Sequence, residues 1–488
     1  MKKIDAFIIY SDANQAQQTV NELKKSDTIN NILLLTPENI NETIEGCKSI
    51  EIDTLLSSNT IKKIALNTES DYTALYMKST ALKLGYFALE RMIQIAEDSS
   101  AGMVYSDYFA IVAGEKKNYP VIDYQEGSLR DDFNFGSFIL FNSTVFKRAA
   151  ERIKSEDYKF AGLYDLRLKV SQIADLVHIN EFLYTEFEED NRESGKKIFD
   201  YVDPKNRQVQ IEMEKACTQH LKDVGAYLEP IFNPIEFNMD EFEYEASVII
   251  PVRNRIKTIK DAIASVLRQK TVFKFNLIVV DNHSTDGTTE AIEEFNNDSR
   301  LIHLIPNRND LGIGGCWNLG IHHPQCGKFT IQLDSDDIYS GEDTLQKIVN
   351  AFYEQNCAMV VGTYQMTNFD LEMIPPGIID HREWTPENGR NNALRINGLG
   401  APRAFYTPIL REIKLPNTSY GEDYAVGLRI SRNYQIGRIY DILYLCRRWE
   451  DNSDASLDIV KMNGHNLYKD RIRTWELQAR KKIKRENL

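Results

Sequence analysis

The chain has 488 residues, of which 42% are hydrophobic and 27% charged, and its formal net charge at pH 7 is −14. This length provides for two to four domains, each with a core of its own. The excess of acidic residues argues against nucleic acid as a partner, because proteins that bind phosphate backbones carry a basic surface. A small anionic substrate remains compatible with this charge if a metal ion or a few arginines neutralise it locally.

The cysteines are scattered along the chain, with no Cys-x-x-Cys pair and no histidine at zinc-ligand spacing. They are Cys47, Cys217, Cys316, Cys326, Cys357 and Cys446. This usage predicts reduced, buried thiols. The N-terminus lacks the apolar run of a signal peptide, and no segment approaches the roughly 20 apolar residues of a membrane span. We therefore expect a soluble, cytoplasmic protein.

In the first half, short apolar runs alternate with helical patterns. We expect strands at 6–10, 32–35, 61–66, 134–141 and 182–184, and helices at 13–25 and 86–98, the latter leading into 102–105. Strands that alternate with helices predict an α/β domain with a mostly parallel sheet and right-handed crossovers.

The second half repeats this order. Residues 6–10 parallel 247–251, and residues 87–108 can be laid on 343–364 without a gap. The chain is therefore expected to contain two copies of one architecture.

In the same comparison, Ile64–Glu69 falls opposite Ile331–Asp336. Asn67 and Glu69 would then stand where the second copy has an aspartate pair. We expect the first copy to keep the fold without a metal site, because a shared fold is no evidence for a shared function. A second active site is the alternative.

A polar connector separates the two copies. It contains a highly charged loop at 188–197, an amphipathic helical pattern at 206–224, two prolines and an acidic run at 240–245. Such a composition is typical of a linker. We predict a first domain at 1–190, a connector at 191–240, a second domain at 241–455 and a basic helical tail at 456–488.

The stretch Phe329–Asp337 is central to the second copy. Its first five residues predict a buried strand, which ends in Asp334, Asp336 and Asp337. In an extended segment Asp334 and Asp336 point the same way. Mg²⁺ or Mn²⁺ bound by the pair would relieve their repulsion and share its remaining ligands with phosphates. The alternative is that these acids cap a helix or form a turn.

Polar loops also follow the strands at 247–251 and 275–280. Asp281 could accept hydrogen bonds from a ligand, or cap the helix that begins near Thr288. Gly312, Gly314 and Gly315 form neither a P-loop nor a dinucleotide fingerprint. They are more consistent with a close approach of the backbone to a substrate or to another segment.

These motifs together resemble family 2 glycosyltransferases of the GT-A fold. The resemblance covers residues 247 to about 449 and rests on Ile-Ile-Pro-Val-Arg-Asn-Arg, Val-Val-Asp-Asn-His-Ser-Thr-Asp-Gly, Trp-Asn-Leu-Gly, Leu-Asp-Ser-Asp-Asp and Tyr-Gly-Glu-Asp-Tyr in that order. It implies two GT-A-like α/β domains. It also implies transfer of a sugar from a nucleoside diphosphate donor, UDP or GDP, with inversion at the anomeric carbon.

The resemblance also implies roles for individual residues. Asp336 would ligate Mn²⁺ or Mg²⁺, Asp334 would lie against the metal, ribose and diphosphate, and Asp423 would be the general base. The remaining substrate-binding candidates are Pro251, Val252, Arg253, Asn254, Asp281, Asn318, Glu422, Arg448 and Trp449. Glu422 and Asp423 could instead cap the helix at 424–432.

The chain departs from the family pattern at Leu445. Membrane-embedded processive members carry Gln-x-x-Arg-Trp there, whereas this chain reads Leu-Cys-Arg-Arg-Trp. This departure, together with the lack of membrane spans, argues against a polymerising synthase. Arg447 or Arg448 could contact diphosphate, and Arg403 is a candidate for binding an anion. His283 and His381 are expected at the surface.

The C-terminal end, residues 471–485, is basic and amphipathic. It could lie on an anionic membrane, which would suit a lipid-linked acceptor, or be a solvated tail. Glycans and proteins are the other acceptors considered. Two alternative functions are a nucleotidyltransferase and a catalytically inactive scaffold that binds sugars or nucleotides.

Overall fold

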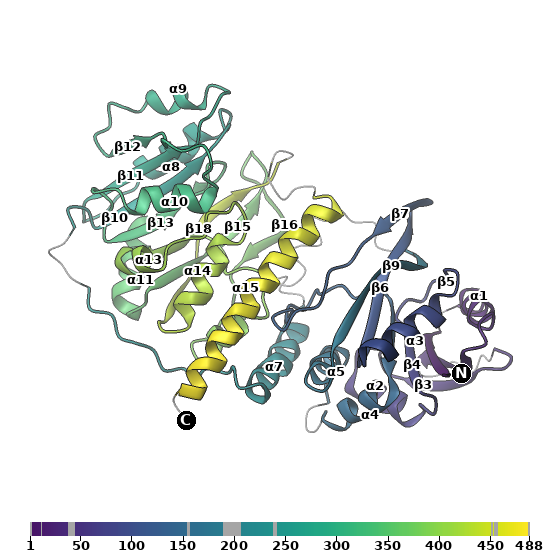
Figure 1. Cartoon of the computed structure of the whole chain (residues 1–488). Helices are drawn as coiled ribbons and strands as arrows, with labels where there is room; N and C mark the ends of the chain where they lie inside the picture. The colour runs from purple at the N-terminus through teal and green to yellow at the C-terminus, as the bar shows by residue number, and fades with distance from the viewer. Residues whose placement is uncertain are drawn as a thin grey trace. The chain divides into compact units, whose positions relative to one another are not determined.

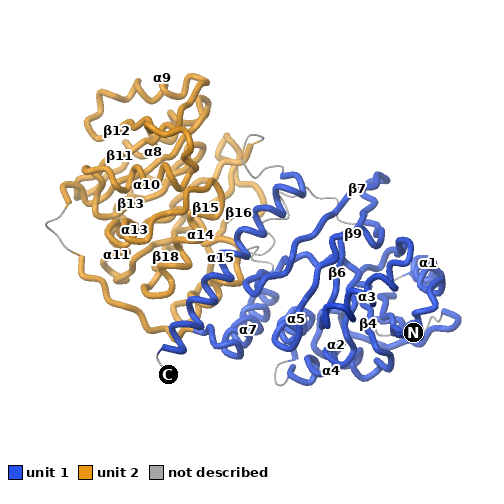
Figure 2. Tube along the Cα trace, viewed as in Figure 1, with its two compact units in different colours: residues 1–227, 457–488 blue, residues 228–456 orange. Residues whose placement is uncertain are grey.

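The computed structural model describes residues 2–10, 12–37, 44–153, 157–188, 206–237, 242–449, 452 and 457–486. Its internal contacts divide the chain into two units (Figure 2). The N-terminal unit comprises residues 1–227 and 457–488, and the C-terminal unit comprises residues 228–456. Each unit is an α/β structure built on one mixed sheet (Figure 1).

The sheet of the N-terminal unit has the strand order β3-β2-β1-β4-β8-β6-β9-β5, with β7 beside β6. Its elements are β1 (Ile4–Ile9), α1 (Ala13–Leu23), β2 (Ile29–Pro37), β3 (Lys48–Ile52), α2 (Ser58–Leu66), β4 (Tyr72–Tyr76), β5 (Lys83–Leu84), α3 (Ala88–Ser99), β6 (Met103–Val112), β7 (Glu115–Tyr119), β8 (Phe138–Asn142), α4 (Ser143–Glu151), α5 (Gly162–Ser171), β9 (Leu176–Phe187), α7 (Arg207–Asp223) and α15 (Ile459–Glu486). Strands β3, β2, β1 and β4 are parallel, whereas β8 is antiparallel to both its neighbours.

The sheet of the C-terminal unit has the order β12-β11-β10-β13-β17-β15-β18-β14, with β16 beside β15. Its elements are β10 (Ala246–Val252), α8 (Ile259–Leu267), β11 (Phe275–Asp281), α9 (Thr288–Glu293), β12 (Leu301–Leu304), α10 (Ile313–Ile321), β13 (Phe329–Gln332), β14 (Ile338–Tyr339), α11 (Thr344–Gln355), β15 (Met359–Thr367), β16 (Met373–Ile379), α12 (Gly389–Asn392), β17 (Arg403–Tyr406), α13 (Thr407–Ile413), α14 (Glu422–Ser431) and β18 (Ile436–Arg447).

The two sheets share one topology, strand for strand. Helix packing repeats as well: α2, α4 and α5 contact one another as α10, α13 and α14 do, and α3 lies on β6 and β9 as α11 lies on β15 and β18. Helices cover both faces of each sheet, so the central strands are buried and apolar. Strands β10 and β11 of the C-terminal unit are examples. The α/β class and the predicted internal repeat are confirmed.

Residues 61–66, predicted as a strand, belong instead to helix α2. Ser57 caps this helix by accepting a hydrogen bond from the Thr60 N–H, and Ile61 and Ile64 are buried at helical spacing. A short apolar run cannot be assigned to strand or helix from its pattern alone. The prediction was wrong because the cap, which starts the helix, was overlooked.

The counterpart of β13 is therefore β4. Tyr72 pairs with the first residue of β1, as Phe329 pairs with the first residue of β10. Counting from these residues, Met77 stands at the position of Asp334. The predicted match of Asn67 and Glu69 to the aspartate pair was wrong, but the segment between β4 and β5, Met-Lys-Ser-Thr-Ala-Leu, contains no carboxylate either.

The C-terminal segment is not a separate tail, since the contacts group it with the N-terminal unit. Helix α15 buries Ile472, Arg473 and Leu477 there. The amphipathic helix predicted at 206–224 is present as α7. Most of the predicted charged loop, and the boundary near residue 240, lie outside the described residues. Among the described residues, no helix has the length and hydropathy needed to cross a lipid bilayer.

Candidate active site

A cavity of about 310 Å³ opens in the C-terminal unit where β10 and β13 end. Both aspartates of the predicted metal pair line it, as does Asp423 at the start of α14. The other lining residues are Pro251, Arg255, Ile313, Trp317, Gln332, Ser335, Asp337, Arg403, Phe405, Leu415, Glu422, Cys446, Arg448 and Asn452. Asp334, Asp336 and Asp423, which are far apart in sequence, thus share one cavity.

Asp334 is held in place directly after β13. Its N–H lies 3.1 Å from the Tyr444 hydroxyl oxygen, and its Oδ1 accepts a hydrogen bond from Gln332 Nε2 at 2.9 Å. Burial raises the pKa of the Asp334 carboxyl, Arg403 opposes this, and the charge of Asp336 adds to it. Burial and the negative charges of Asp336 and Asp334 raise the pKa of Asp337 well above its usual value. The site concentrates more negative charge than its surroundings neutralise.

Asp336 receives donors from the segment after β18. Its Oδ2 accepts hydrogen bonds from Asn452 Nδ2 at 3.1 Å and Trp449 Nε1 at 3.4 Å, and Arg255 Nε lies 4.0 Å away. Trp449, predicted to bind substrate, therefore contacts the metal-pair residue. The sequence motifs did not indicate that Asn452 or Arg255 would lie near Asp336. Asn452 lies beyond the resemblance, and Arg255, the last residue of the first motif, was assigned no role.

The carboxylates fit a divalent ion that completes its coordination with other oxygens. Among the described residues, no group of three or more His, Cys, Asp or Glu side chains is arranged to hold a metal. Mg²⁺ typically takes one or two carboxylates and fills its remaining positions with water and phosphate oxygens. Two crowded aspartates in the lining of a polar cavity match this preference.

Asp423 and Glu422 begin α14, after Gly421 in the left-handed conformation (φ 77°). Asp423 Oδ2 forms an ion pair with Arg403 Nη1 at 2.7 Å. Arg403, predicted to bind an anion, is thus already paired with the candidate base. Burial, followed by the charge of Asp423, raises the pKa of Glu422 to about 8. Glu422 Oε2 is buried without a hydrogen-bond partner.

The loop after β10 contributes less to the cavity than predicted. Pro251 lines the cavity, whereas Val252, Arg253 and Asn254 do not. Asn254 has a left-handed backbone (φ 55°), and its Oδ1 accepts a hydrogen bond from the Thr285 N–H at 2.8 Å. This residue links the loops that follow β10 and β11.

Asp281 is fully buried, and both its oxygens are used within the protein. Oδ1 accepts a hydrogen bond from the Ser284 N–H at 3.0 Å, and Oδ2 accepts one from Thr289 Oγ1 at 2.5 Å. Although burial opposes ionisation, the His303 imidazole 3.7 Å from Oδ2 and the hydrogen bonds from Ser284 and Thr289 hold the pKa of Asp281 below its usual range. The bond to Thr289, in α9, agrees with the alternative role in positioning that helix.

Asn318 does not line the cavity but fixes a residue that does. Its amide donates to the Leu415 carbonyl at 2.8 Å and accepts from the Leu415 N–H at 3.0 Å. The nearby glycines allow close packing, since a Cβ on Gly314 would lie 1.9 Å from the Pro416 carbonyl oxygen. The predicted close backbone approach is made to the segment that precedes Asp423.

Arg447 is the last residue of β18 and Arg448 follows it; of the two, Arg448 lines the cavity. Arg447 donates from Nε to the Asp336 carbonyl oxygen at 2.6 Å and from Nη1 to Asp261 at 2.8 Å. His381, expected at the surface, is buried and bonded to Glu383. Neither His381 nor Glu383 lines the cavity.

Residues 247–408 match the model of glycosyl transferase family 2. The C-terminal unit thus contains a region that matches the family which the motifs indicated. Among known proteins, the Escherichia coli UDP-Glc:alpha-D-GlcNAc-diphosphoundecaprenol beta-1,3-glucosyltransferase WfgD is 28% identical over 239 residues, which cover 48% of this chain and 85% of the relative. The putative teichuronic acid biosynthesis glycosyltransferase TuaG of Bacillus subtilis is 31% identical over 120 residues, 25% of this chain and 46% of the relative.

Solved structures include that of S. aureus TarS residues 1–349 in complex with UDP-GlcNAc. It superposes with a TM-score of 0.37 and 22% identity, covering 47% of this chain and 70% of that chain.

Proposed function

We propose that the C-terminal unit transfers a sugar from a nucleoside diphosphate sugar to an acceptor hydroxyl, with inversion at the anomeric carbon. The observation that carries this proposal is the single cavity lined by Asp334, Asp336 and Asp423. The name of WfgD gives UDP-Glc as donor and a diphosphoundecaprenol-linked sugar as acceptor. It supports a UDP-sugar donor and a lipid-linked or polymeric surface glycan as acceptor here.

On the donor side, Asp336 and Asp334 would hold Mn²⁺ or Mg²⁺. A bound divalent ion supplies Lewis-acid stabilisation to the departing diphosphate. Arg448 and Arg255 line the same cavity and bring positive charge to it. The guanidinium group suits diphosphate because it can donate two parallel hydrogen bonds to the oxygens.

On the acceptor side, Asp423 takes the proton of the attacking hydroxyl. A hydroxyl is a weak nucleophile, and a carboxylate within hydrogen-bond reach typically accelerates its attack by 10²–10⁴-fold. Arg403 keeps the Asp423 carboxylate oriented through their 2.7 Å ion pair. A single displacement, with Asp423 and the diphosphate on opposite sides of the anomeric carbon, produces inversion.

We propose no transfer reaction for the N-terminal unit. Met77 stands at the position of Asp334 in the shared topology. Leu163 stands at the position of Asp423, because α5 and α14 have the same length and precede β9 and β18 by the same number of residues. An apolar pair can neither hold a cation nor accept a proton.

Contact with an anionic membrane, where a lipid-linked acceptor would be met, remains part of the proposal. It would use the exposed face of α15, since Ile472 and Leu477 are buried within the N-terminal unit. Trp475, 55% exposed, lies on that exposed face beside exposed basic residues. An anionic surface would attract them.

The proposal is tested by incubating the protein with Mn²⁺ and a panel of UDP- and GDP-sugars and measuring released nucleoside diphosphate. Asp423→Asn should lower turnover of the preferred donor and acceptor at least 100-fold. Asp441→Asn is the matched control, because Asp441 is an exposed carboxylate outside the cavity. Undiminished turnover in Asp423→Asn would remove Asp423 from the mechanism.

A further inference from the structure

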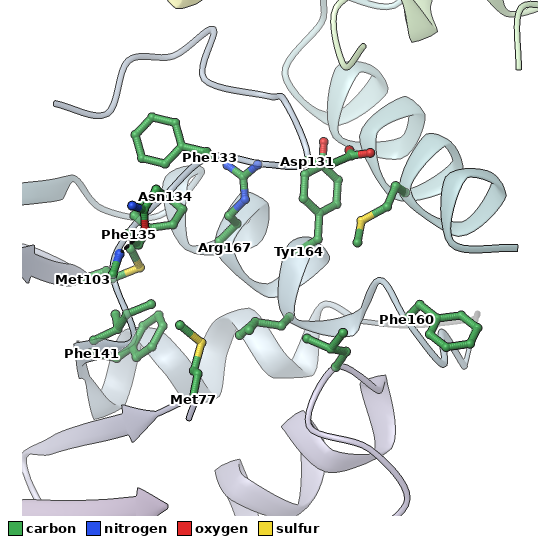
Figure 3. Close-up of a pocket in the computed structure, with 15 residues that line it drawn as sticks. Met77, Met103, Asp131, Phe133, Asn134, Phe135, Phe141, Phe160, Tyr164 and Arg167 are labelled. Carbon is green, nitrogen blue, oxygen red and sulfur yellow. Dashed lines mark hydrogen bonds between the residues drawn. The ribbon is translucent and has the colours of Figure 1, made fainter. Parts of the chain in front are cut away.

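The N-terminal unit contains a cavity of about 200 Å³, drawn in Figure 3. Most of the side chains that line it are apolar. The lining residues are Leu56, Met77, Met103, Asp131, Phe133, Asn134, Phe135, Gly136, Ile139, Phe141, Phe160, Leu163, Tyr164, Arg167 and Met213. Protein interiors normally leave few voids larger than a water molecule, so a cavity of this size calls for an explanation.

This cavity occupies the place of the active-site cavity in the repeated fold. Met77 and Leu163, at the positions of Asp334 and Asp423, both line it. Strand β8 matches β17, and in that match Ile139 takes the position of Arg403. The first copy has therefore kept the space and replaced the charged groups that define the site in the second copy.

One aromatic position is common to both cavities. Phe141 pairs with Thr73 in the first sheet as Phe405 pairs with Thr330 in the second, and each phenylalanine lines its cavity. Because the matching strands β8 and β17 each contribute a phenylalanine to the lining, the two cavities occupy the same place in the fold. They differ in the chemistry of their other lining residues.

Three of the polar side chains that line the first cavity, those of Arg167, Tyr164 and Asn134, are engaged within the unit. Arg167 donates from Nη1 and Nη2 to the carbonyls of Ser128 and Arg130 at 2.9 and 2.8 Å. The Tyr164 hydroxyl donates to the Leu129 carbonyl at 2.6 Å, and Asn134 Oδ1 accepts from the Gly136 N–H at 2.8 Å. A sugar needs partners for several hydroxyls, so this lining favours an apolar ligand instead.

The cavity is accessible from solvent. In Figure 3 its lining extends from Met103 and Phe135 on one side, past Met77 and Tyr164, to Phe160 on the other. Leu56 in this lining is 39% exposed, which places part of the wall at the surface. The lining includes methionines, whose flexible side chains adapt to ligands of irregular shape.

We propose that this cavity binds a branched hydrocarbon chain of about ten carbons, the prenyl part of a lipid. An apolar cavity of about 150 Å³ accommodates benzene, so a somewhat larger cavity suits two isoprene units. That the chain belongs to the lipid-linked acceptor rests on the proposed function; that the cavity binds a prenyl chain does not. The first copy thus serves as a lipid-binding module in the same chain as the proposed transferase.

The test measures binding of isoprenoid alcohols to the full chain by calorimetry, with no nucleotide sugar present. Geraniol, with ten carbons, should bind at least tenfold more tightly than the five-carbon prenol, because each buried methylene strengthens binding about fourfold. Decahydro-2-naphthol, a rigid ring alcohol with ten carbons, should bind more weakly than geraniol. Stronger binding of the ring would overturn the assignment to a chain.

Two substitutions of one residue locate the ligand. Leu163→Asp restores the charge found in the other copy, and Leu163→Trp fills the space; each should weaken geraniol binding at least tenfold. Leu163 is only partly buried, so both variants are expected to fold, and thermal unfolding verifies this. Leu66→Asp, at an 84% exposed position outside the lining, is the matched control and should bind geraniol as the wild type does.

Binding that is absent, or that neither Leu163 variant weakens, overturns the proposal. Asp423→Asn should bind geraniol like the wild type. A failure of glycosyl transfer therefore leaves the binding measurement intact, and a failure of prenyl binding leaves the proposed transfer reaction intact.

Discussion

Arg403 and Asp423 form the most closely coupled pair in the cavity. Arg403 Nη1 lies 2.7 Å from Asp423 Oδ2 and also donates to the Gly400 carbonyl at 2.8 Å. The Arg403 guanidinium is thereby held between the Gly400 carbonyl and the Asp423 carboxylate. We infer that Arg403 acts as a positioning residue for the proposed base.

Arg403→Gln should lower kcat at least tenfold while changing the KM for the donor less than threefold. The expected reason is that Asp423 loses its orientation, which matters at the moment of proton transfer rather than for donor binding. Arg403→Lys, which keeps a charge, should recover part of the loss. Steady-state kinetics at fixed Mn²⁺ measure both parameters. A rise in KM alone would assign Arg403 to donor binding.

For individual residues, the motifs predicted which carboxylates come together, and Asp334, Asp336 and Asp423 do line one cavity. They could not predict which polar atoms the protein itself uses. Both oxygens of Asp281 and the amide of Asn318 are occupied by neighbouring segments. That outcome depends on the loops that follow other strands, which a linear pattern does not contain.

Helices α5 and α7 pack against each other in the N-terminal unit and enclose a histidine. His220, on α7, is 3% exposed, and its Nδ1 lies 2.9 Å from Gln172 Nε2. Burial, followed by the positive charges of Lys169 and Arg167, lowers the pKa of His220 to about 3. The imidazole is therefore neutral in the folded unit.

The stability of this unit should fall as the pH is lowered from about 6.5 towards 3. In that range the unfolded chain binds a proton at His220 and the folded unit does not, so protonation favours unfolding. The loss attributable to this residue is about 3 kcal/mol between pH 6.5 and pH 4. Urea unfolding across this range should show a smaller dependence on pH for His220→Gln. Equal dependence in both proteins would contradict the buried neutral imidazole.

Among the elements, some short apolar runs were assigned correctly and others were not. The strands at 6–10 and 247–251 are present as β1 and β10 because nearly continuous apolar residues suit a sheet covered on both faces. The run 61–66 became helix because Ser57 caps it. A serine cap is visible in the sequence, so this error was avoidable.

The last helix of the chain returns to the first unit. Asp470 on α15 is fully buried; it accepts a hydrogen bond from Ser128 Oγ at 2.9 Å and forms ion pairs with Arg473 at 2.8 Å and Arg130 at 3.3 Å. The end of the chain is thus part of the N-terminal core. Composition predicted only a basic, amphipathic helix there, because a contact between residues more than 300 apart leaves no local trace.

Asp470→Asn should destabilise the N-terminal unit by about 3 kcal/mol, since it removes a buried carboxylate that pairs with two buried arginines. Chemical denaturation followed by circular dichroism measures this loss. Glu486→Gln on the same helix is the control, because its pair with Lys482 is solvent-exposed and such pairs contribute under about 1 kcal/mol. Similar small losses in both variants would show that Asp470 is not essential to this core.

Across the whole molecule, two copies of one topology carry different chemistry. Asp334, Asp423 and Arg403 of one cavity are replaced by a methionine, a leucine and an isoleucine in the other. Repetition was visible in the sequence because the strands and their spacing persist. The correspondence of the two cavities was not, since it requires the register of β4 and β8, which only the structure provides.

The central claim is that a cation held by Asp336 and the carboxylate of Asp423 act in one cavity on a nucleoside diphosphate sugar. The most direct test is the dependence of donor turnover on Mn²⁺ concentration for the wild type and for Asp336→Asn. The account predicts saturable activation of the wild type, loss of activity in EDTA, and an apparent Mn²⁺ affinity at least tenfold weaker in Asp336→Asn. Equal turnover in EDTA and in Mn²⁺, with no effect of Asp336→Asn, would contradict it.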